Sequence, residues 1–196
     1  MKVKTLVLIV LLAVVTLAGC QSTPPTATPE PPAPTPEPIS SFPLTVTDGV
    51  GTRVTLEAEP MRIVLMAPGH TEILFALGLA DRVVGVTEYC NYPPEAAELP
   101  KIGGFADIDL EQVVGLEPDL VFGTTLHEGQ IAPALQERGV TVFIAEPQTV
   151  MEVLDTVLTI GHLTGRDEAA TELAAQMREH GGRASNAAGQ WMPVGH

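Results

Sequence analysis

The hydrophobic and polar positions that follow residue 42 form two kinds of pattern, one typical of strands and one typical of helices. Leu44–Thr47 and Arg53–Leu56 alternate apolar and polar residues on either side of Asp48-Gly49, a spacing that predicts a β-hairpin. Four nearly continuous apolar runs follow the hairpin, and such runs are typical of parallel strands buried on both faces. These predicted strands are residues 62–67, 83–86, 120–122 and 140–144.

Helical patterns lie between and after these runs. Thr71 is predicted to cap the first helix. Asp109 with Gln112, and Thr149 with Glu152, each have the spacing of a capping box at a helix start. Further helices are predicted at 130–138 and 167–179. Strands that alternate with helices predict an α/β fold, with a parallel sheet flanked by helices and an initial β-hairpin.

Three of the predicted loops leave the carboxyl ends of strands, where ligands bind in sheets of this kind. They begin at Pro68, Thr87 and Gly123, and the second continues as a long irregular segment to residue 106. Because the strands are predicted to be parallel, these loops should meet at one edge of the sheet. The candidate ligand-binding residues in them are Pro68, Gly69, His70, Tyr89, Phe105, Thr124 and Thr125.

Residues 1–19 have the features of a targeting segment that does not contribute to the fold. Lys2 and Lys4 precede an apolar run, and Leu17-Ala18-Gly19-Cys20 matches a bacterial lipobox, in which the cysteine receives a lipid. The apolar run is short for a bilayer span. A lipoprotein signal peptide is therefore favoured over an ordinary secretory peptide or a transmembrane helix.

The two ends of the remaining chain have no apolar periodicity. Residues 20–41 are rich in proline, which favours an extended tether of roughly 60 Å at about 3.1 Å per residue. A plain disordered stalk fits the same composition. Residues 181–196 carry neither a helical nor a strand period, which indicates an aberrant or truncated tail of a naturally short chain, a fragment or a frameshifted product.

The composition excludes several classes of function. The formal net charge is −14 and no basic stripe is present, so nucleic acid is excluded as a partner. Cys20 and Cys90 are the only cysteines, and without a local base or a second thiol Cys90 is predicted to be a partly buried small hydrophobe rather than a nucleophile or metal ligand. The sequence has no phosphate-binding glycine loop, HExxH motif or serine elbow, so no enzyme is predicted.

Four longer segments carry a family resemblance: RIVLMAPGHTEILFALGLADRVVGVT, EYCNYPPEA, IGGFADIDLEQVVGLEPDLVFG and PALQERGVTVFIAEPQTVMEVLDTVLTIGHLTG. Together they resemble the N-terminal lobe of the iron-siderophore, haem and cobalamin binding proteins of ABC importers, and are closest in pattern to cobalamin-binding lipoproteins. The resemblance implies two lobes joined by one long helix, with ligand between them. It assigns 42–150 to a ligand-binding lobe and 151–180 to the start of the bridging helix, with the second lobe missing.

The resemblance also implies roles for single residues. Tyr89 would lie against a corrin, and Phe105 falls where cobalamin-binding relatives place a tryptophan against the ligand. Pro68, Gly69 and His70 would line the floor of the cleft. Each aromatic ring has a plainer alternative, which is to pack its own loop onto the lobe.

Several residues keep two interpretations. Glu111 matches an acidic residue that docks onto the permease, but in the first turn of a helix it would also stabilise that helix by about 0.3–1 kcal/mol. Thr124 and Thr125 could hydrogen-bond ligand side groups or cap their loop. His70, or alternatively Tyr89, could be an axial ligand of cobalt or haem iron, although no resident metal or cofactor is predicted.

The predicted function is that of a substrate-binding lipoprotein for an ABC importer of a metal chelate, exported and anchored at the outer face of a bacterial cell membrane, or periplasmic. Cobalamin or another corrinoid is the first predicted ligand, and haem or a ferric siderophore is the alternative; the partners are the permease and the membrane. Arg82 and Arg138 are not expected in the cleft, which disfavours a siderophore. An exported thiol or metal enzyme using Cys90 with His70 or His127, or a non-transport interaction module, is the alternative from another class. His127 itself is predicted to lie in a surface loop near the cleft rim.

Overall fold

The computed structural model describes residues 42–188, and their side chains as far as residue 181. The predicted signal peptide, Cys20, the proline-rich tether and residues 189–196 lie outside this part. Within it, no helix combines the length and apolarity that a membrane crossing needs.

Four short parallel strands form the central sheet in the order β4-β3-β5-β6. Leu65 of β3 pairs with Val86 of β4 and with Phe122 of β5, and Phe122 pairs in turn with Phe143 of β6. The strands are shorter than the apolar runs, because buried flanking residues such as Ala67 lie outside the regular pairing. Their bounds are β3 Ile63–Leu65, β4 Val83–Val86, β5 Leu120–Gly123 and β6 Val142–Ile144.

The predicted hairpin is confirmed, but it forms a separate two-stranded antiparallel sheet of β1 (Leu44–Thr47) and β2 (Arg53–Leu56). Its turn lies beside the edge strand β6, where the Gly49 amide donates a hydrogen bond to the Ile144 carbonyl at 2.7 Å. The Asp48 carboxylate fixes the turn from inside by accepting from turn amides at 2.7 and 3.1 Å.

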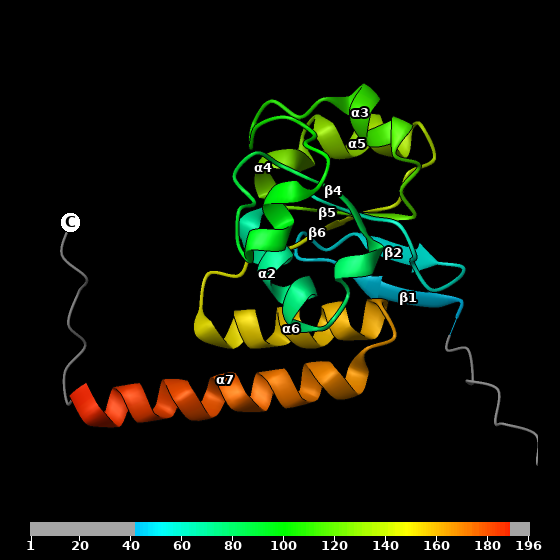
Figure 1. The fold of residues 1–196 in the computed structure, drawn as a ribbon. Coiled ribbons are helices and arrows are strands. Elements are labelled where there is room, and N and C mark those ends of the chain that lie inside the picture. Colours follow the sequence, from blue (N-terminus) through cyan, green and yellow to red (C-terminus); the bar gives the residue numbers. More distant parts are fainter. Residues whose placement is uncertain (1–41, 189–196) are drawn as a thin grey trace, which may run out of the picture. The chain divides into compact units, whose positions relative to one another are not determined.

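Helices cover both faces of the parallel sheet (Figure 1). One face packs against α2 (Pro68–Ala76), α6 (Val150–Leu163) and α7 (Asp167–Ala188). The opposite face packs against α3 (Leu110–Gly115) and α5 (Ile131–Gln136). The remaining turns are η2 (Ala80–Arg82), η3 (Pro94–Glu98) and α4 (Thr125–Glu128).

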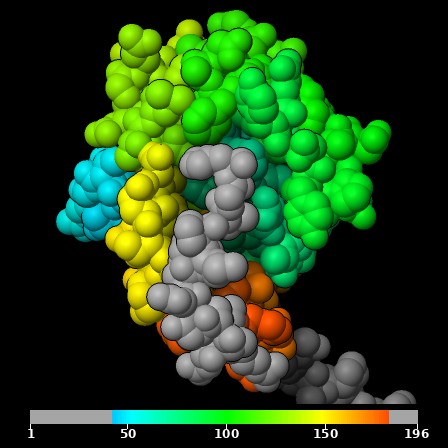
Figure 2. Space-filling model, turned by 90° about the vertical axis from the view of Figure 1, so that its left-hand side faces the viewer, coloured from blue at the N-terminus to red at the C-terminus, as the bar shows by residue number. Residues whose placement is uncertain are grey.

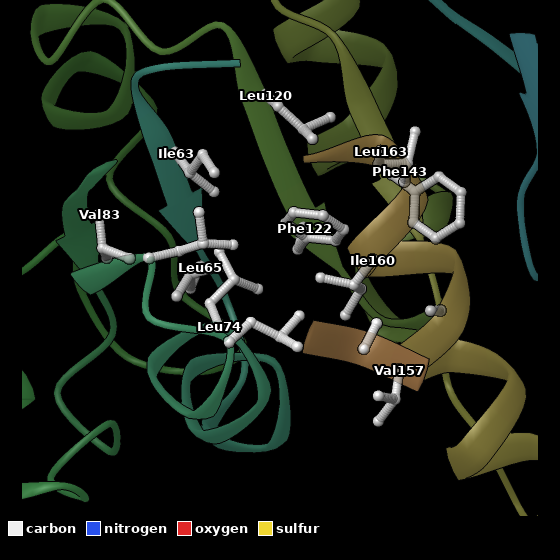
Figure 3. Close-up of a cluster of buried hydrophobic side chains, with 14 of the residues drawn as sticks. Ile63, Leu65, Leu74, Val83, Leu120, Phe122, Phe143, Val157, Ile160 and Leu163 are labelled. Atoms are coloured by element: carbon white, nitrogen blue, oxygen red, sulfur yellow. The ribbon is translucent and has the colours of Figure 1, made fainter. Parts of the chain in front are cut away.

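Successive residues of a strand point to opposite faces of its sheet, and here both sets are buried. Leu65 and Phe122 belong to the cluster on the α6 side, whereas Val64 and Val121 belong to the cluster on the α3 side. Figure 3 shows Phe122 among side chains that come from β3, α2 and α6. Burial on both faces explains why the strands appear in the sequence as continuous apolar runs.

The first helix begins earlier than predicted. α2 starts at Pro68, after Ala67 in an extended conformation, rather than at a capping Thr71. Proline suits the first helical position because no intrahelical bond requires its missing N–H. Thr71 lies inside the helix, where its hydroxyl donates to the Ala67 carbonyl at 3.2 Å. Residues 68–70, expected in a loop, therefore form the first helical turn, and Gly78 follows the helix with φ of 73°.

Asp109 and Thr149 cap α3 and α6 as predicted, but neither capping box is complete. Asp109 Oδ1 accepts from the Gln112 amide at 3.1 Å, whereas the Asp109 amide donates to the Ile102 carbonyl at 2.9 Å. The Thr149 hydroxyl accepts from the Glu152 amide at 3.2 Å, and the Glu152 carboxylate accepts from the residue before the cap. In each predicted box the cap side chain makes its bond to the helix. The return bond, from the side chain three residues later to the cap amide, is replaced by another contact.

The segment predicted as the start of a bridging helix contains two helices, α6 and α7, which are separated by residues 164–166. They approach closely at Gly161, where an added Cβ would clash with that of Ala170. α7 continues to Ala188, so the prediction that no periodic structure follows His180 is wrong for residues 181–188. Gly181 and Gly182 have low helix propensity, which is why these last helical turns were not predicted from the sequence.

Candidate functional site

Two neighbouring hollows lie at the carboxyl edge of the sheet, next to the first turn of α2. The first, here called the aromatic hollow, has a volume of about 520 Å³ and is lined by Pro68, Tyr89, Phe105, Ala106 and Asp107. The second, here called the His70 cavity, has a volume of about 500 Å³. Its walls come from α2, α6, α7 and the loops after β4, β5 and β6, and include Gly69, His70, Tyr92, Thr124, Glu146 and Met177. Figure 2 views this side of the molecule, with the start of α6 in yellow and α7 in orange.

The aromatic hollow brings together three of the candidate residues. Tyr89 follows β4 and leaves 60% of its surface exposed, whereas Phe105 is half-buried. Both rings line the hollow together with Pro68, which follows β3. The predicted meeting of these loops at one edge is confirmed, while their role in binding a ligand stays a prediction.

The remaining candidates line other spaces, and their role in binding a ligand stays a prediction. Gly69, His70 and Thr124 line the His70 cavity rather than the aromatic hollow. Thr125 lines a smaller space between the hairpin turn and α6. The separation arises because residues 68–70 are helical, and successive side chains of a helix point in different directions.

A buried histidine holds the Phe105 loop in place. His127 is fully buried, so the prediction that it lies in a surface loop is wrong. Its Nδ1 accepts from the Thr124 amide at 3.0 Å, which requires that this nitrogen carry no proton. Its Nε2 then donates to the Phe105 carbonyl at 2.8 Å, and the two rings meet edge to face at 5.3 Å.

His70 is a buried polar residue that lines the His70 cavity. Only 4% of it is exposed, and its Nδ1 has no hydrogen-bond partner. Burial lowers the pKa of His70 to about 4, although a hydrogen bond with the Ala145 backbone opposes that shift. The imidazole is therefore neutral at pH 7, with one nitrogen that could still accept or donate a hydrogen bond.

Glu146 joins the loops that follow β5 and β6. Its carboxylate accepts from the Thr125 hydroxyl and, at 3.1 Å, from the Thr125 amide. The hydroxyl contact is the main reason why the pKa of Glu146 lies below its ordinary value, and the amide contact adds to it. Thr125 and Thr124 thus both make contacts within their loop, Thr125 with Glu146 and Thr124 with His127, and a contact with ligand stays a prediction.

Sequence reasoning missed several walls of the His70 cavity. Glu146 and Pro147 line the cavity and follow β6. Ligands bind at the carboxyl ends of parallel strands, so the argument that selected the loops after β3, β4 and β5 also applies to the loop after β6. Leu173 and Met177 come from α7, and no local pattern distinguishes them from ordinary core residues.

Comparisons with known proteins identify the family of this arrangement. The family described as periplasmic binding protein matches residues 63–195. The chain belongs to the periplasmic binding protein family. The ABC transporter substrate-binding lipoprotein YvrC of Bacillus subtilis (strain 168) is 34% identical over 175 residues, which are 86% of this chain and 53% of YvrC.

Two solved structures carry the same fold. The periplasmic vitamin B12 binding protein BtuF of Vibrio cholerae matches 69% of this chain and 53% of its own, with a TM-score of 0.61 and 28% identity. The periplasmic heme-binding protein RhuT of Roseiflexus sp. RS-1 matches 67% of this chain and 51% of its own, with a TM-score of 0.62 and 30% identity. The chain spans about half the length of these relatives.

As a periplasmic binding protein, the chain belongs to a family of binding proteins rather than of enzymes. Cys90, predicted to be partly buried, is almost completely buried, and its Sγ lies 3.2 Å from the Thr87 hydroxyl. Within residues 42–181, no three histidine, cysteine or acidic side chains are placed to hold a metal ion.

The two arginines considered from the sequence have structural partners. Arg82 donates to Glu59 at 2.6 Å and to the Thr164 carbonyl at 3.1 Å. Arg138 donates to the Ala134 carbonyl at 2.7 Å and lies 3.9 Å from the Glu111 carboxylate. Neither arginine lines the aromatic hollow or the His70 cavity.

Proposed function

We propose that this chain is the substrate-binding component of an ABC importer for a metal chelate, with cobalamin or a related corrinoid as its first ligand. The observation that carries the proposal is the aromatic hollow, where Tyr89 and Phe105 line one space at the carboxyl edge of the sheet. Flat rings offer stacking area to a macrocycle at little cost in conformational entropy. The likeness to the vitamin B12 binding protein of Vibrio cholerae supports the same ligand class.

The support beneath Phe105 favours a preorganised site. A ligand that orders a loose loop loses affinity to that ordering. Here the Phe105 carbonyl is already held by His127 at 2.8 Å, and His127 is fully buried. The exposed Tyr89 supplies the adaptable wall, and the fixed Phe105 supplies the rigid one.

Haem is the second candidate ligand, favoured by the likeness to RhuT. His70 or Tyr89 would then be the axial ligand, since imidazole and phenolate both bind haem iron. Tyr89 is exposed at its hollow, whereas His70 Nδ1 is buried. A ferric siderophore ranks lower, because no arginine of the part that the structure describes lines either space to bind its acidic groups.

Delivery would use the exposed tip of α3 and a lipid anchor. Glu111 leaves 87% of its side chain exposed, and its ion pair with Arg138 is long at 3.9 Å. Exposed pairs of this kind contribute about 0–1 kcal/mol, so a permease arginine could replace Arg138 at little cost. The lipobox assigns the anchor to Cys20; a Cys20→Ser variant that still partitions with membranes would contradict this assignment.

Titration of the purified protein with cyanocobalamin and with haemin tests the ligand. We expect saturable binding of cyanocobalamin, followed by absorbance and by calorimetry. If haemin binds and cyanocobalamin does not, the ligand is haem rather than a corrinoid. Binding of neither would contradict the transport proposal and favour a protein-interaction module.

A further inference from the structure

We infer that the two hollows select ligands whose side groups are uncharged amides and reject ligands that carry carboxylates, and that Glu146 determines this selection. The inference rests on the proposed function and deepens it. It separates two classes of macrocycle that have rings of similar size, because corrinoids carry carboxamide side groups whereas haem carries propionates.

The charges that line the two hollows are all of one sign. Glu72 and Glu146 line the His70 cavity, and Asp107 lines the aromatic hollow. Among the described residues, no lysine or arginine lines either space. A carboxylate on the ligand would therefore meet only like charges, without the guanidinium or ammonium group that normally binds it.

Glu146 is held as a charged acceptor. The Thr125 hydroxyl and amide both donate to its carboxylate, and they keep its pKa below the ordinary value. A carboxylate has about four lone-pair positions, so acceptor positions remain after the two Thr125 contacts. An amide N–H₂ of a ligand can donate to these positions, whereas a ligand carboxylate cannot.

His70 does not compensate for this negative charge. It lines the same cavity as Glu146 and is neutral at pH 7, because burial lowers its pKa to about 4. Its Nδ1 has no partner, which is costly for a buried polar atom and points to a missing hydrogen-bonding group. A neutral polar group of a ligand satisfies that atom without introducing a charge.

A matched pair of corrins tests the selection on the whole chain. Dicyanocobinamide carries amide side groups, and dicyanocobyrinic acid carries carboxylates on the same ring with the same metal. We expect the amide form to bind at least about tenfold more tightly at low salt, because the carboxylates that line the two hollows repel those of the acid form. The preference should decrease as salt is added.

The Glu146→Gln variant identifies the residue responsible. Glutamine keeps an oxygen that accepts from Thr125 but removes the charge, so binding of the acid form should improve by about fivefold or more. Binding of the amide form should weaken, because it loses a charged acceptor, and the preference for the amide form should therefore shrink from both sides. Glu137→Gln is the matched control, since it removes one exposed charge outside both hollows.

The possible results distinguish the two proposals. If cyanocobalamin and both corrins fail to bind, the proposed function and this inference fail together. If the corrins bind but the acid form binds as tightly as the amide form, the inference is overturned and the proposed function stands. If the preference exists but Glu137→Gln changes it as much as Glu146→Gln does, Glu146 is not its determinant.

Discussion

His127 Nε2 lies 2.8 Å from the Phe105 carbonyl oxygen, and the rings of the two residues meet edge to face at an interplanar angle of 77°. The same imidazole accepts from the Thr124 amide through Nδ1. One buried side chain therefore connects the end of β5 to the loop that carries an aromatic wall of the proposed site. It acts on the site as a positioning residue, since it contacts the Phe105 loop from behind.

Replacing His127 should therefore affect both stability and binding. In His127→Ala the Phe105 carbonyl and the Thr124 amide lose their partner, and each buried unsatisfied group costs about 1–3 kcal/mol. We expect the free energy of unfolding to fall by that order, measured in urea, and amide exchange to accelerate around Phe105. His180→Ala, on the exposed face of α7, is the control and should change stability by less than about 0.5 kcal/mol. Equal effects of the two variants would contradict the positioning role.

The buried His70 should make the fold sensitive to acid. Its pKa is about 4 in the folded chain, against an ordinary value of 6.5. As the pH falls below 6.5, the unfolded chain takes up a proton that the folded chain refuses, so stability is full above pH 6.5 and decreases toward pH 4. At about 1.4 kcal/mol per unit, the loss reaches about 3 kcal/mol.

Urea unfolding at several values between pH 7 and pH 4.5 measures this effect. A His70→Gln variant removes the titrating group and should show a shallower decline over the same range. If the variant and the natural chain decline in parallel, the acid sensitivity has another origin.

Gly103 should be essential for the loop that carries Phe105. Its φ is 98°, and an added Cβ would clash with the Asp107 carbonyl. Gly103→Ala should therefore lower the free energy of unfolding by about 1–3 kcal/mol and weaken ligand binding with it. Gly115→Ala is the matched control: its Cβ meets nothing, and at the last residue of α3 it should change the free energy of unfolding by less than about 0.5 kcal/mol. Thermal unfolding of both variants checks the pair.

Tyr89 should contribute to binding through its ring rather than its hydroxyl. Tyr89→Ala removes a stacking surface and should weaken corrinoid binding by about 1 kcal/mol, roughly fivefold. Tyr89→Phe keeps the ring and should bind normally in calorimetric titration. Loss of binding in Tyr89→Phe would instead indicate that the phenol oxygen contacts the ligand. Leu126→Ala, another exposed large side chain outside both hollows, controls for lost surface.

Sequence reasoning succeeded where the relevant contacts are local or strictly periodic. The strands that are buried on both faces appear as apolar runs, and the capping side chains of Asp109 and Thr149 lie within three residues of their targets. It failed at Thr71, because a proline at the first helical position started α2 earlier than the threonine suggested. The end of α7 was missed because two glycines have low helix propensity, although the helix continues through them.

The sequence by itself determined the α/β alternation, the family and the loops that hold the candidate residues, since these depend on periodicity and on short segments. Only the tertiary structure decided that Pro68 and His70 line different hollows, that His127 is buried beneath Phe105, and that Glu146 bonds to Thr125. His127 and Phe105 are 22 residues apart, and Glu146 and Thr125 are 21 residues apart. Contacts across such separations are set by how the helices pack on the sheet, and no local pattern encodes that packing.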